Sequence, residues 1–208
     1  MLNVLIAGIG GQGSVLAAKI LAAAAQARGW KVRTAETIGM AQRGGNVTSH
    51  VRMGDAGEEV HAPLIARGTA DCIVALEPGE AVRALPYLAP DGLLVCARTA
   101  IPSVETTLSG EPYEAEPLLA YLEGAAPHFL AVDEAAICEE VGSRKVANLV
   151  MLASAVAASN GTSFGLRGAI GTDELVRAME ACVKPAFVAL NRAAIDTAIA
   201  RVGAPSVN

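Results

Sequence analysis

The sequence predicts an α/β protein with a mostly parallel sheet between two helical layers, and with helices at its C-terminal end. Two observations carry this prediction. Residues 3–7 form a short apolar run of the kind found in buried parallel strands. The run opens into a glycine-rich turn, where Gly8, Gly10 and Gly13 have the G-x-G-x-x-G spacing and Gly11 adds a further glycine. Because a helical pattern follows the turn, the order strand, turn and helix indicates a Rossmann-like three-layer α/β/α fold.

The first helix is expected at residues 14–28, because apolar residues recur there at helical spacing and a glycine follows Arg28. A second strand at residues 31–35 completes a β–α–β start. Glu36 ends this strand, 23 positions after Gly13. An acidic residue about 20 positions after such a turn accepts the ribose hydroxyls of NAD in dinucleotide-binding folds. A loop cap or a partner for a nearby arginine explains Glu36 equally well, so both interpretations stay open.

Residues 37–45 are too polar and too rich in glycine for a helix and predict a loop. A third strand is expected at residues 46–53, with apolar residues on one face and Thr48, His50 and Arg52 on the other. This polar face either meets solvent or belongs to a site. The strand emerges from Arg43-Gly44-Gly45, where backbone amides beside a guanidinium would suit a phosphate or a carboxylate.

The remaining segments fit the same fold. Further strands are expected at residues 71–76, 92–97 and 128–132. Helices are expected at residues 78–85, after Ser143, after Thr172 as N-cap, and from Pro185 onwards. The polar stretch 102–115 predicts an excursion from the sheet.

The composition bounds the function. A chain of 208 residues suits one domain, spanning residues 1–208. A net charge of −5 without a basic cluster argues against nucleic acid as a partner. Met1 leads directly into the first strand, and the most apolar stretch, 146–158, is too short to span a bilayer, so we expect a cytoplasmic protein without a membrane partner. A hydrophobic content of 52% indicates either surface covered by another subunit or an alanine-rich core.

No metal site is expected in this chain. The four cysteines are widely separated and form no C-x-x-C pair, so their spacing indicates neither an iron–sulfur nor a zinc site. They are most simply small buried apolar residues, namely Cys72, Cys96, Cys138 and Cys182. The histidines His50, His61 and His128 stand singly, which is typical of structural roles.

Two motifs together resemble a known family. Residues 8–13, Gly-Ile-Gly-Gly-Gln-Gly, and residues 36–52, Glu-Thr-Ile-Gly-Met-Ala-Gln-Arg-Gly-Gly-Asn-Val-Thr-Ser-His-Val-Arg, resemble the small subunit of 2-oxoacid:ferredoxin oxidoreductases. The γ subunits of the pyruvate and 2-oxoglutarate enzymes tend to show Tyr-Gly-Pro where this chain has Ile38-Gly39-Met40, which favours the indolepyruvate (arylpyruvate) branch. The similarity continues through residues 70–80 and from Asn148 to Asn191, so it covers nearly the whole chain as one pyruvate/ketoisovalerate oxidoreductase γ-type domain.

The resemblance implies an enzyme complex that oxidatively decarboxylates a 2-oxoacid on thiamine diphosphate. Electrons would pass through 4Fe–4S clusters to ferredoxin, and coenzyme A would be the co-substrate that receives the acyl group. The resemblance places thiamine diphosphate and the clusters in a large catalytic partner subunit. This chain would then hold no tightly bound cofactor, act only within the hetero-oligomer, and present part of the active-site cavity.

The candidate site follows from the same motifs. Arg43 would contact the substrate carboxylate or a coenzyme A phosphate. The candidate binding set around it consists of Gly8, Gly10, Gly11, Gln12, Gly13, Glu36, Gln42, Gly44 and Gly45. Packing of the subunit interface explains these residues equally well. Two other functions stay open: a stand-alone NAD(P)- or flavin-dependent reductase using Glu36 for ribose, and a non-catalytic structural subunit.

Overall fold

The computed structural model describes residues 1–39, 45–54, 57–102, 107–108 and 112–203. Its strands are β1 (Leu2–Ile9), β2 (Lys31–Ile38), β3 (Asn46–Gly54), β4 (Ala70–Ala75), β5 (Leu88–Ala97) and β6 (His128–Val132). Its helices are α1 (Ser14–Ala27), α2 (Pro78–Ala84), α4 (Ala115–Ala125), α5 (Glu134–Val141), α6 (Ala147–Ala158), α7 (Thr172–Cys182) and α8 (Val188–Gly203). Short 3-10 turns lie at Leu85–Tyr87, Arg144–Val146 and Pro185–Phe187.

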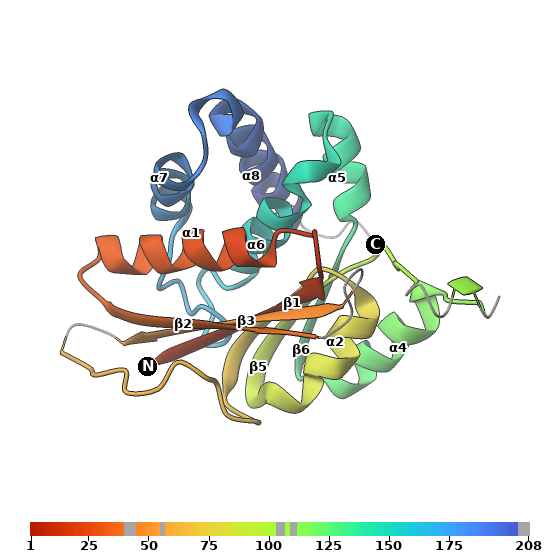
Figure 1. Ribbon diagram of the computed structural model, residues 1–208, viewed down its shortest axis with the longest axis horizontal. Helices are drawn as coiled ribbons and strands as arrows, with labels where there is room; N and C mark the ends of the chain where they lie inside the picture. Colours follow the sequence, from red (N-terminus) through yellow and green to blue (C-terminus); the bar gives the residue numbers. More distant parts are fainter. Residues whose placement is uncertain (40–44, 55–56, 103–106, 109–111, 204–208) are drawn as a thin grey trace.

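The sheet separates two unequal helical layers (Figure 1). One face is covered by α1, α5, α6, α7 and α8, and the other by α2 and α4. Each face has its own apolar core, one beneath α1 and α6 and the other beneath α2 and α4. This three-layer arrangement confirms the predicted α/β fold with C-terminal helices. No helix in the described ranges combines the length and apolarity needed to cross a membrane.

The strand order is β2-β3-β1-β4-β5-β6, with β1, β4, β5 and β6 parallel to their neighbours. β3 runs antiparallel to both β1 and β2 and lies between them. The predicted β–α–β start is therefore wrong in one respect, because β1 and β2 do not pair. The connection between β2 and β3 is short, so β3 can fold back as a hairpin strand, whereas a parallel pair needs a crossover.

Most predicted elements are confirmed, including β1, α1, β3, β4 and β6. Two helices, α4 and α5, are additions that the sequence reading did not include. β2 continues to Ile38 and β5 begins at Leu88, so both are longer than predicted. Thr172 is the first residue of α7, not its N-cap; Gly171 has that place and its N–H donates to Glu174 Oε2 at 2.6 Å.

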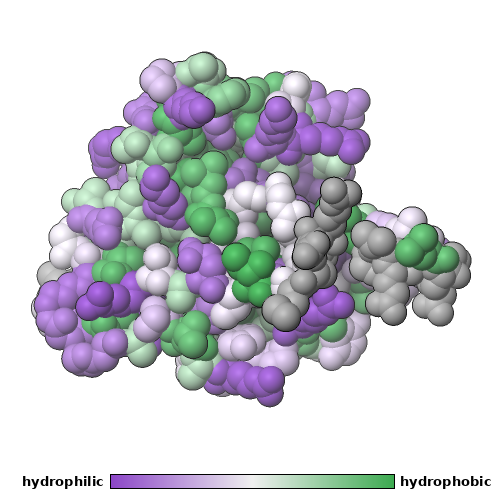
Figure 2. All heavy atoms as spheres, in the orientation of Figure 1, coloured by the Kyte–Doolittle hydropathy of each residue, from purple (hydrophilic) through white to green (hydrophobic). Residues whose placement is uncertain are grey.

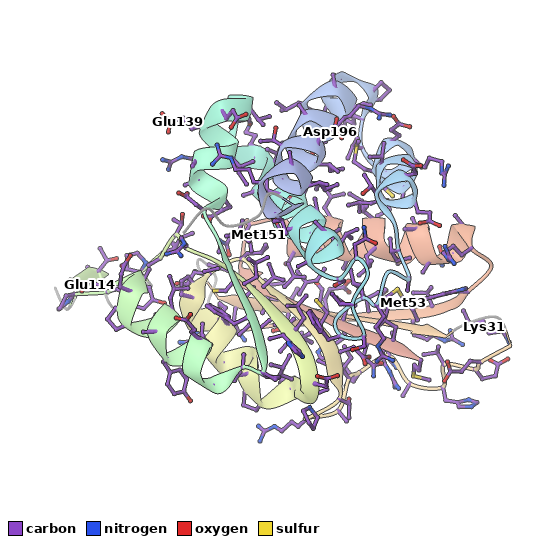
Figure 3. The ribbon with its side chains drawn as sticks, turned by 180° about the vertical axis from the view of Figure 1, so that it is seen from behind. Lys31, Met53, Glu114, Glu139, Met151 and Asp196 are labelled. Atoms are coloured by element: carbon purple, nitrogen blue, oxygen red, sulfur yellow. The ribbon has the colours of Figure 1, made fainter. Side chains whose placement is uncertain are left out.

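Helix α6 passes through the middle of the larger helical layer, and it is apolar on all sides. It packs against α1, α8 and the sheet, which accounts for its even burial. Met151 lies on α6 over the sheet (Figure 3). The stretch 146–158, which stood out by its apolarity, is therefore a central core helix that positions its N-terminal end next to the glycine turn.

Candidate functional site

The side chain of Gln12 fixes the glycine turn at the end of β1. Its Oε1 accepts a hydrogen bond from the N–H of Ile9 at 2.6 Å, and its Nε2 donates to the carbonyl of Leu76 at 2.8 Å. Leu76 follows β4, the parallel neighbour of β1. A Cβ on Gly8 would lie 2.9 Å from Gln12 Oε1, so Gly8 leaves room for this side chain. Gln12 thus ties the ends of two adjacent strands together.

Gly13, the last glycine of the turn, contacts Asn148, which is 135 positions further along the chain. Gly13 has a left-handed φ of 83° and caps α1. Asn148, at the start of α6, donates from Nδ2 to the Gly13 carbonyl at 3.0 Å. A Cβ on Gly13 would lie 2.8 Å from the same Nδ2 atom. Both the backbone conformation and the close approach of Asn148 therefore require glycine at this position.

The second motif meets the first at the same edge of the sheet. The N–H of Gly10 donates to the carbonyl of Gly45 at 2.9 Å. The predicted site residues Gln42, Arg43 and Gly44 lie outside the described residues. The backbone contact shows that Gly45, the residue directly after them, lies against the glycine turn.

Glu36 lies exposed on β2, opposite Ser49 of β3, which in turn lies opposite Ile6 of β1. One whole strand therefore separates Glu36 from the strand that carries the glycine turn. A residue that binds the ribose of a dinucleotide would need to end the strand next to β1. The position of Glu36 consequently lends no support to the stand-alone reductase.

Side chains on the polar face of β3 bind the backbone of the segment that connects β3 to β4. His50 is buried, and its Nδ1 accepts a hydrogen bond from the N–H of Ile65 at 3.2 Å. Arg52 donates to the Ala62 carbonyl at 2.8 Å and to Asn3 Oδ1 at 3.0 Å. These groups thus fix the segment between β3 and β4 and confirm a structural role for His50.

A cavity of about 370 Å³ opens beside the glycine turn. It lies at the carboxyl ends of the parallel strands, the usual position of ligands in open α/β sheets. The walls come from the turn, from the segment after β5, and from α5 and α6. The lining residues are Gly11, Gln12, Gly13, Leu16, Leu76, Thr99, Ile101, Glu134, Ala135, Cys138, Arg144, Lys145, Ala147, Asn148 and Met151.

Two cations line this cavity without partners in the described part of the chain. Arg144 and Lys145 form the 3-10 turn before α6, and both side chains are exposed. Arg28, Arg83 and Arg167, in contrast, are all held in ion pairs. The N-terminus of α1 adds its positive dipole end on the same side, and no side chain among the described residues caps it. The cavity therefore suits an anionic ligand.

Two buried carboxylates hold the wall that follows β5. Glu77 Oε1 accepts from the Tyr113 hydroxyl at 2.7 Å and from the N–H of Ile101 at 3.4 Å. Glu134 Oε2 accepts from the N–H of Arg98 at 3.0 Å. Burial and the Glu77 carboxylate raise the pKa of Tyr113, so its hydroxyl stays protonated and keeps donating. The wall formed by residues 98–101 is thus anchored at both ends.

Cys138 lies in the cavity wall, and its side chain is buried. Burial, together with the nearby Glu134 carboxylate, raises the pKa of the Cys138 thiol to about 11. A thiol with such a pKa stays protonated at neutral pH. Cys72 and Cys96 are buried as expected, whereas Cys182 is only half-buried. No group of three or more His, Cys, Asp or Glu side chains that could hold a metal occurs in the described ranges.

Arg144, Lys145 and Glu134 are not among the site residues predicted from the sequence. They belong to neither glycine motif, and only the packing of α5 and α6 against the turn brings them together. The available signal was the pair of consecutive cations directly before the most apolar helix.

Comparison with known proteins gives consistent matches. The family model for pyruvate ferredoxin/flavodoxin oxidoreductase matches residues 3–201. The chain is 36% identical over 196 residues to indolepyruvate oxidoreductase subunit IorB of Archaeoglobus fulgidus, covering 93% of this chain and 92% of that protein. It is 35% identical to the IorB subunit of Thermococcus kodakarensis, covering 72% of this chain and 74% of that protein.

Two solved structures share the fold. The γ subunit of a keto/oxoacid ferredoxin oxidoreductase from Geobacter sulfurreducens has a TM-score of 0.69 at 24% identity, covering 99% of this chain and 100% of that chain. The 2-oxoglutarate:ferredoxin oxidoreductase from Magnetococcus marinus, solved with 2-oxoglutarate, coenzyme A and succinyl-CoA, has a TM-score of 0.69 at 19% identity. This chain matches there over its full length and covers 32% of that larger chain.

Proposed function

Because this chain belongs to the pyruvate ferredoxin/flavodoxin oxidoreductase family, we propose that it is the small subunit of an indolepyruvate or arylpyruvate:ferredoxin oxidoreductase. The IorB relatives support this branch, since the first of them is similar over nearly its whole length. Such an enzyme oxidatively decarboxylates the 2-oxoacid and yields an acyl-CoA. Residues 1–208 would form one γ-type domain, which is not active without its large partner subunit.

Thiamine diphosphate and the 4Fe–4S clusters are assigned to the large partner subunit. Thiamine diphosphate, when bound, supplies the stabilisation of the carbanion formed on decarboxylation. The positions of the cysteines support the assignment of the clusters, because Cys72 and Cys96 lie in apolar cores on opposite faces of the sheet. We further propose ferredoxin as the electron acceptor and a cytoplasmic location, and the net charge of −5 disfavours nucleic acid as a partner.

The cavity with its unpaired cations is the observation that supports a role in the reaction. We assign it to the phosphate groups of coenzyme A, which Arg144 and Lys145 would bind beside the amides of the glycine turn. Arg43, two positions before Gly45 in the sequence, would contact the substrate carboxylate or a further phosphate. The large subunit would then dock against this edge of the sheet.

The test is an Arg144→Ala, Lys145→Ala double variant in the assembled complex. Loss of two phosphate contacts is expected to raise the KM for coenzyme A by about tenfold or more, with a smaller change in kcat. Steady-state kinetics with varied coenzyme A measures this. The control is an Arg177→Ala, Lys184→Ala double variant, which removes the same charge from exposed residues that do not line the cavity. An unchanged KM in the first variant would contradict the assignment.

A further inference from the structure

The cavity carries opposite charges on different walls. Glu134, the first residue of α5, is only 6% exposed, yet it lines the cavity together with Arg144 and Lys145. No ion pair among the described residues joins this carboxylate to either cation. A buried carboxylate in a cavity suited to anions needs a separate explanation, because its charge would repel a phosphate.

The two oxygens of Glu134 have different surroundings. Oε2 accepts the N–H of Arg98, which holds the cavity wall, while no described residue donates a hydrogen bond to Oε1. Buried carboxylates normally use both oxygens as acceptors. As far as the described residues go, Oε1 therefore remains open to a hydrogen-bond donor that arrives with the ligand.

Cys138 lines the cavity between the two charged groups in the sequence, and both charges act on its thiol. The Glu134 carboxylate raises the pKa of this thiol, and the Arg144 guanidinium lowers it. A bound ligand would meet both fields at once. The wall with the cations favours phosphate, and the wall with the carboxylate favours a neutral O–H or N–H group.

We propose that Glu134 is a specificity-determining residue, whose Oε1 accepts a hydrogen bond from a hydroxyl or amino group of the ligand and whose charge excludes plain polyanions. This inference rests on the proposed coenzyme A site. The cavity then takes a phosphorylated ligand that also carries neutral donors, as the nucleoside part of coenzyme A does. The phosphates point to Arg144 and Lys145, and the donors point to Glu134.

The variant Glu134→Gln distinguishes a role of Glu134 in ligand selectivity from its role in holding the cavity wall. The amide oxygen of glutamine still accepts the N–H of Arg98, so the wall keeps its anchor, but the negative charge is gone. Damage to the wall would weaken every ligand. Loss of selectivity would instead weaken coenzyme A and strengthen a plain polyanion, which gives changes of opposite sign.

The experiment measures binding of coenzyme A and of inorganic pyrophosphate to the full chain by titration calorimetry. In Glu134→Gln, the affinity for coenzyme A is expected to fall about fivefold, and that for pyrophosphate to rise about threefold. Glu80→Gln is the matched control, because Glu80 is equally buried and does not line the cavity. In Glu80→Gln, the ratio of the affinities for coenzyme A and pyrophosphate should stay at the wild-type value.

The outcomes separate the two proposals. In one outcome, wild type binds coenzyme A and the Arg144→Ala, Lys145→Ala variant does not, which supports the site. If Glu134→Gln then leaves the ratio of the coenzyme A and pyrophosphate affinities unchanged, only the proposed role of Glu134 is overturned. If both ligands weaken together in Glu134→Gln, the residue is only structural and the inference is again overturned. If wild type does not bind coenzyme A, both the site assignment and this inference fall.

Discussion

A single buried histidine makes the stability of the fold depend on pH. The Nδ1 atom of His50 accepts the N–H of Ile65, so the ring is held with this nitrogen unprotonated. Burial lowers the pKa of His50 from its ordinary value of 6.5. The unfolded chain takes up this proton near pH 6.5, while the folded chain resists it. The contribution of His50 to the free energy of unfolding is therefore fully present above about pH 6.5 and is lost as the pH drops below it.

The variant His50→Asn tests this dependence, since its side-chain oxygen can still accept a hydrogen bond but does not titrate. Urea unfolding at pH 7.5 and pH 5.5 should show a smaller loss of stability in the variant than in wild type. The variant is expected to be less stable at the higher pH by about 1–2 kcal/mol, because a smaller group fills the buried position. An equal loss in both proteins on acidification would show that other groups cause it.

Individual site residues were predictable only where a motif carried them. The spacing of Gly8 to Gly13 reflects the backbone conformation of the turn, so the sequence alone predicts it. The hydrogen bond between Gly10 and Gly45 shows that the two glycine motifs meet. Glu134 and Arg144 line the same cavity only because α5 and the turn before α6 both lie beside the glycine turn. No local pattern in the sequence indicates that these two residues share a cavity.

At the scale of the element, the glycine turn offers two positions that separate backbone strain from steric contact. Gly11 and Gly13 both have left-handed φ angles, of 98° and 83°. A Cβ on Gly11 would meet nothing within 4 Å, while one on Gly13 would reach Asn148 Nδ2 at 2.8 Å. Gly11→Ala is expected to cost about 1–2 kcal/mol, from the φ angle alone. Gly13→Ala should cost about 1 kcal/mol more, because the Asn148 hydrogen bond is displaced.

Urea unfolding of the two variants measures this difference, and the Asn148→Ala background provides the control. Without the Asn148 amide, the additional cost of Gly13→Ala over Gly11→Ala should largely disappear. If both substitutions lower the free energy of unfolding equally in the wild-type background, the Asn148 side chain moves aside without a measurable cost. In that case the contact between α6 and the glycine turn would not hold the start of α1.

The elements themselves were predictable to different degrees. β1 and α1 have patterns that match one structure only, and their bounds agree closely with prediction. α5 is only 8 residues long, and charged residues interrupt its apolar ones, so its periodicity is weak. The position of β3 between β1 and β2 depends on pairing across the sheet. A strand pattern gives the faces of a strand but not its neighbours.

For the whole molecule, the apolar surface near the glycine turn is the feature that a partner subunit would cover. Val15 and Ile38 are exposed by 47% and 69%, at the start of α1 and at the end of β2. Figure 2 shows apolar surface over α1 and over the neighbouring edge of the sheet. Ile38 lies opposite Val47, which lies opposite Gly8, so this surface belongs to the same edge as the turn and the cavity.

If the large subunit docks at this edge, Ile38→Lys should weaken assembly. Burial of a large aliphatic side chain at an interface contributes about 1–3 kcal/mol, so the dissociation constant of the complex should rise by about tenfold or more. Because Ile38 is mostly exposed in the isolated chain, the stability of that chain should change by only about 0.5 kcal/mol. Tyr121→Lys on α4 is the control: it is also exposed, but α4 covers the face of the sheet opposite to α1. Size-exclusion chromatography and titration with the large subunit measure both, and equal affinities would place the docking surface elsewhere.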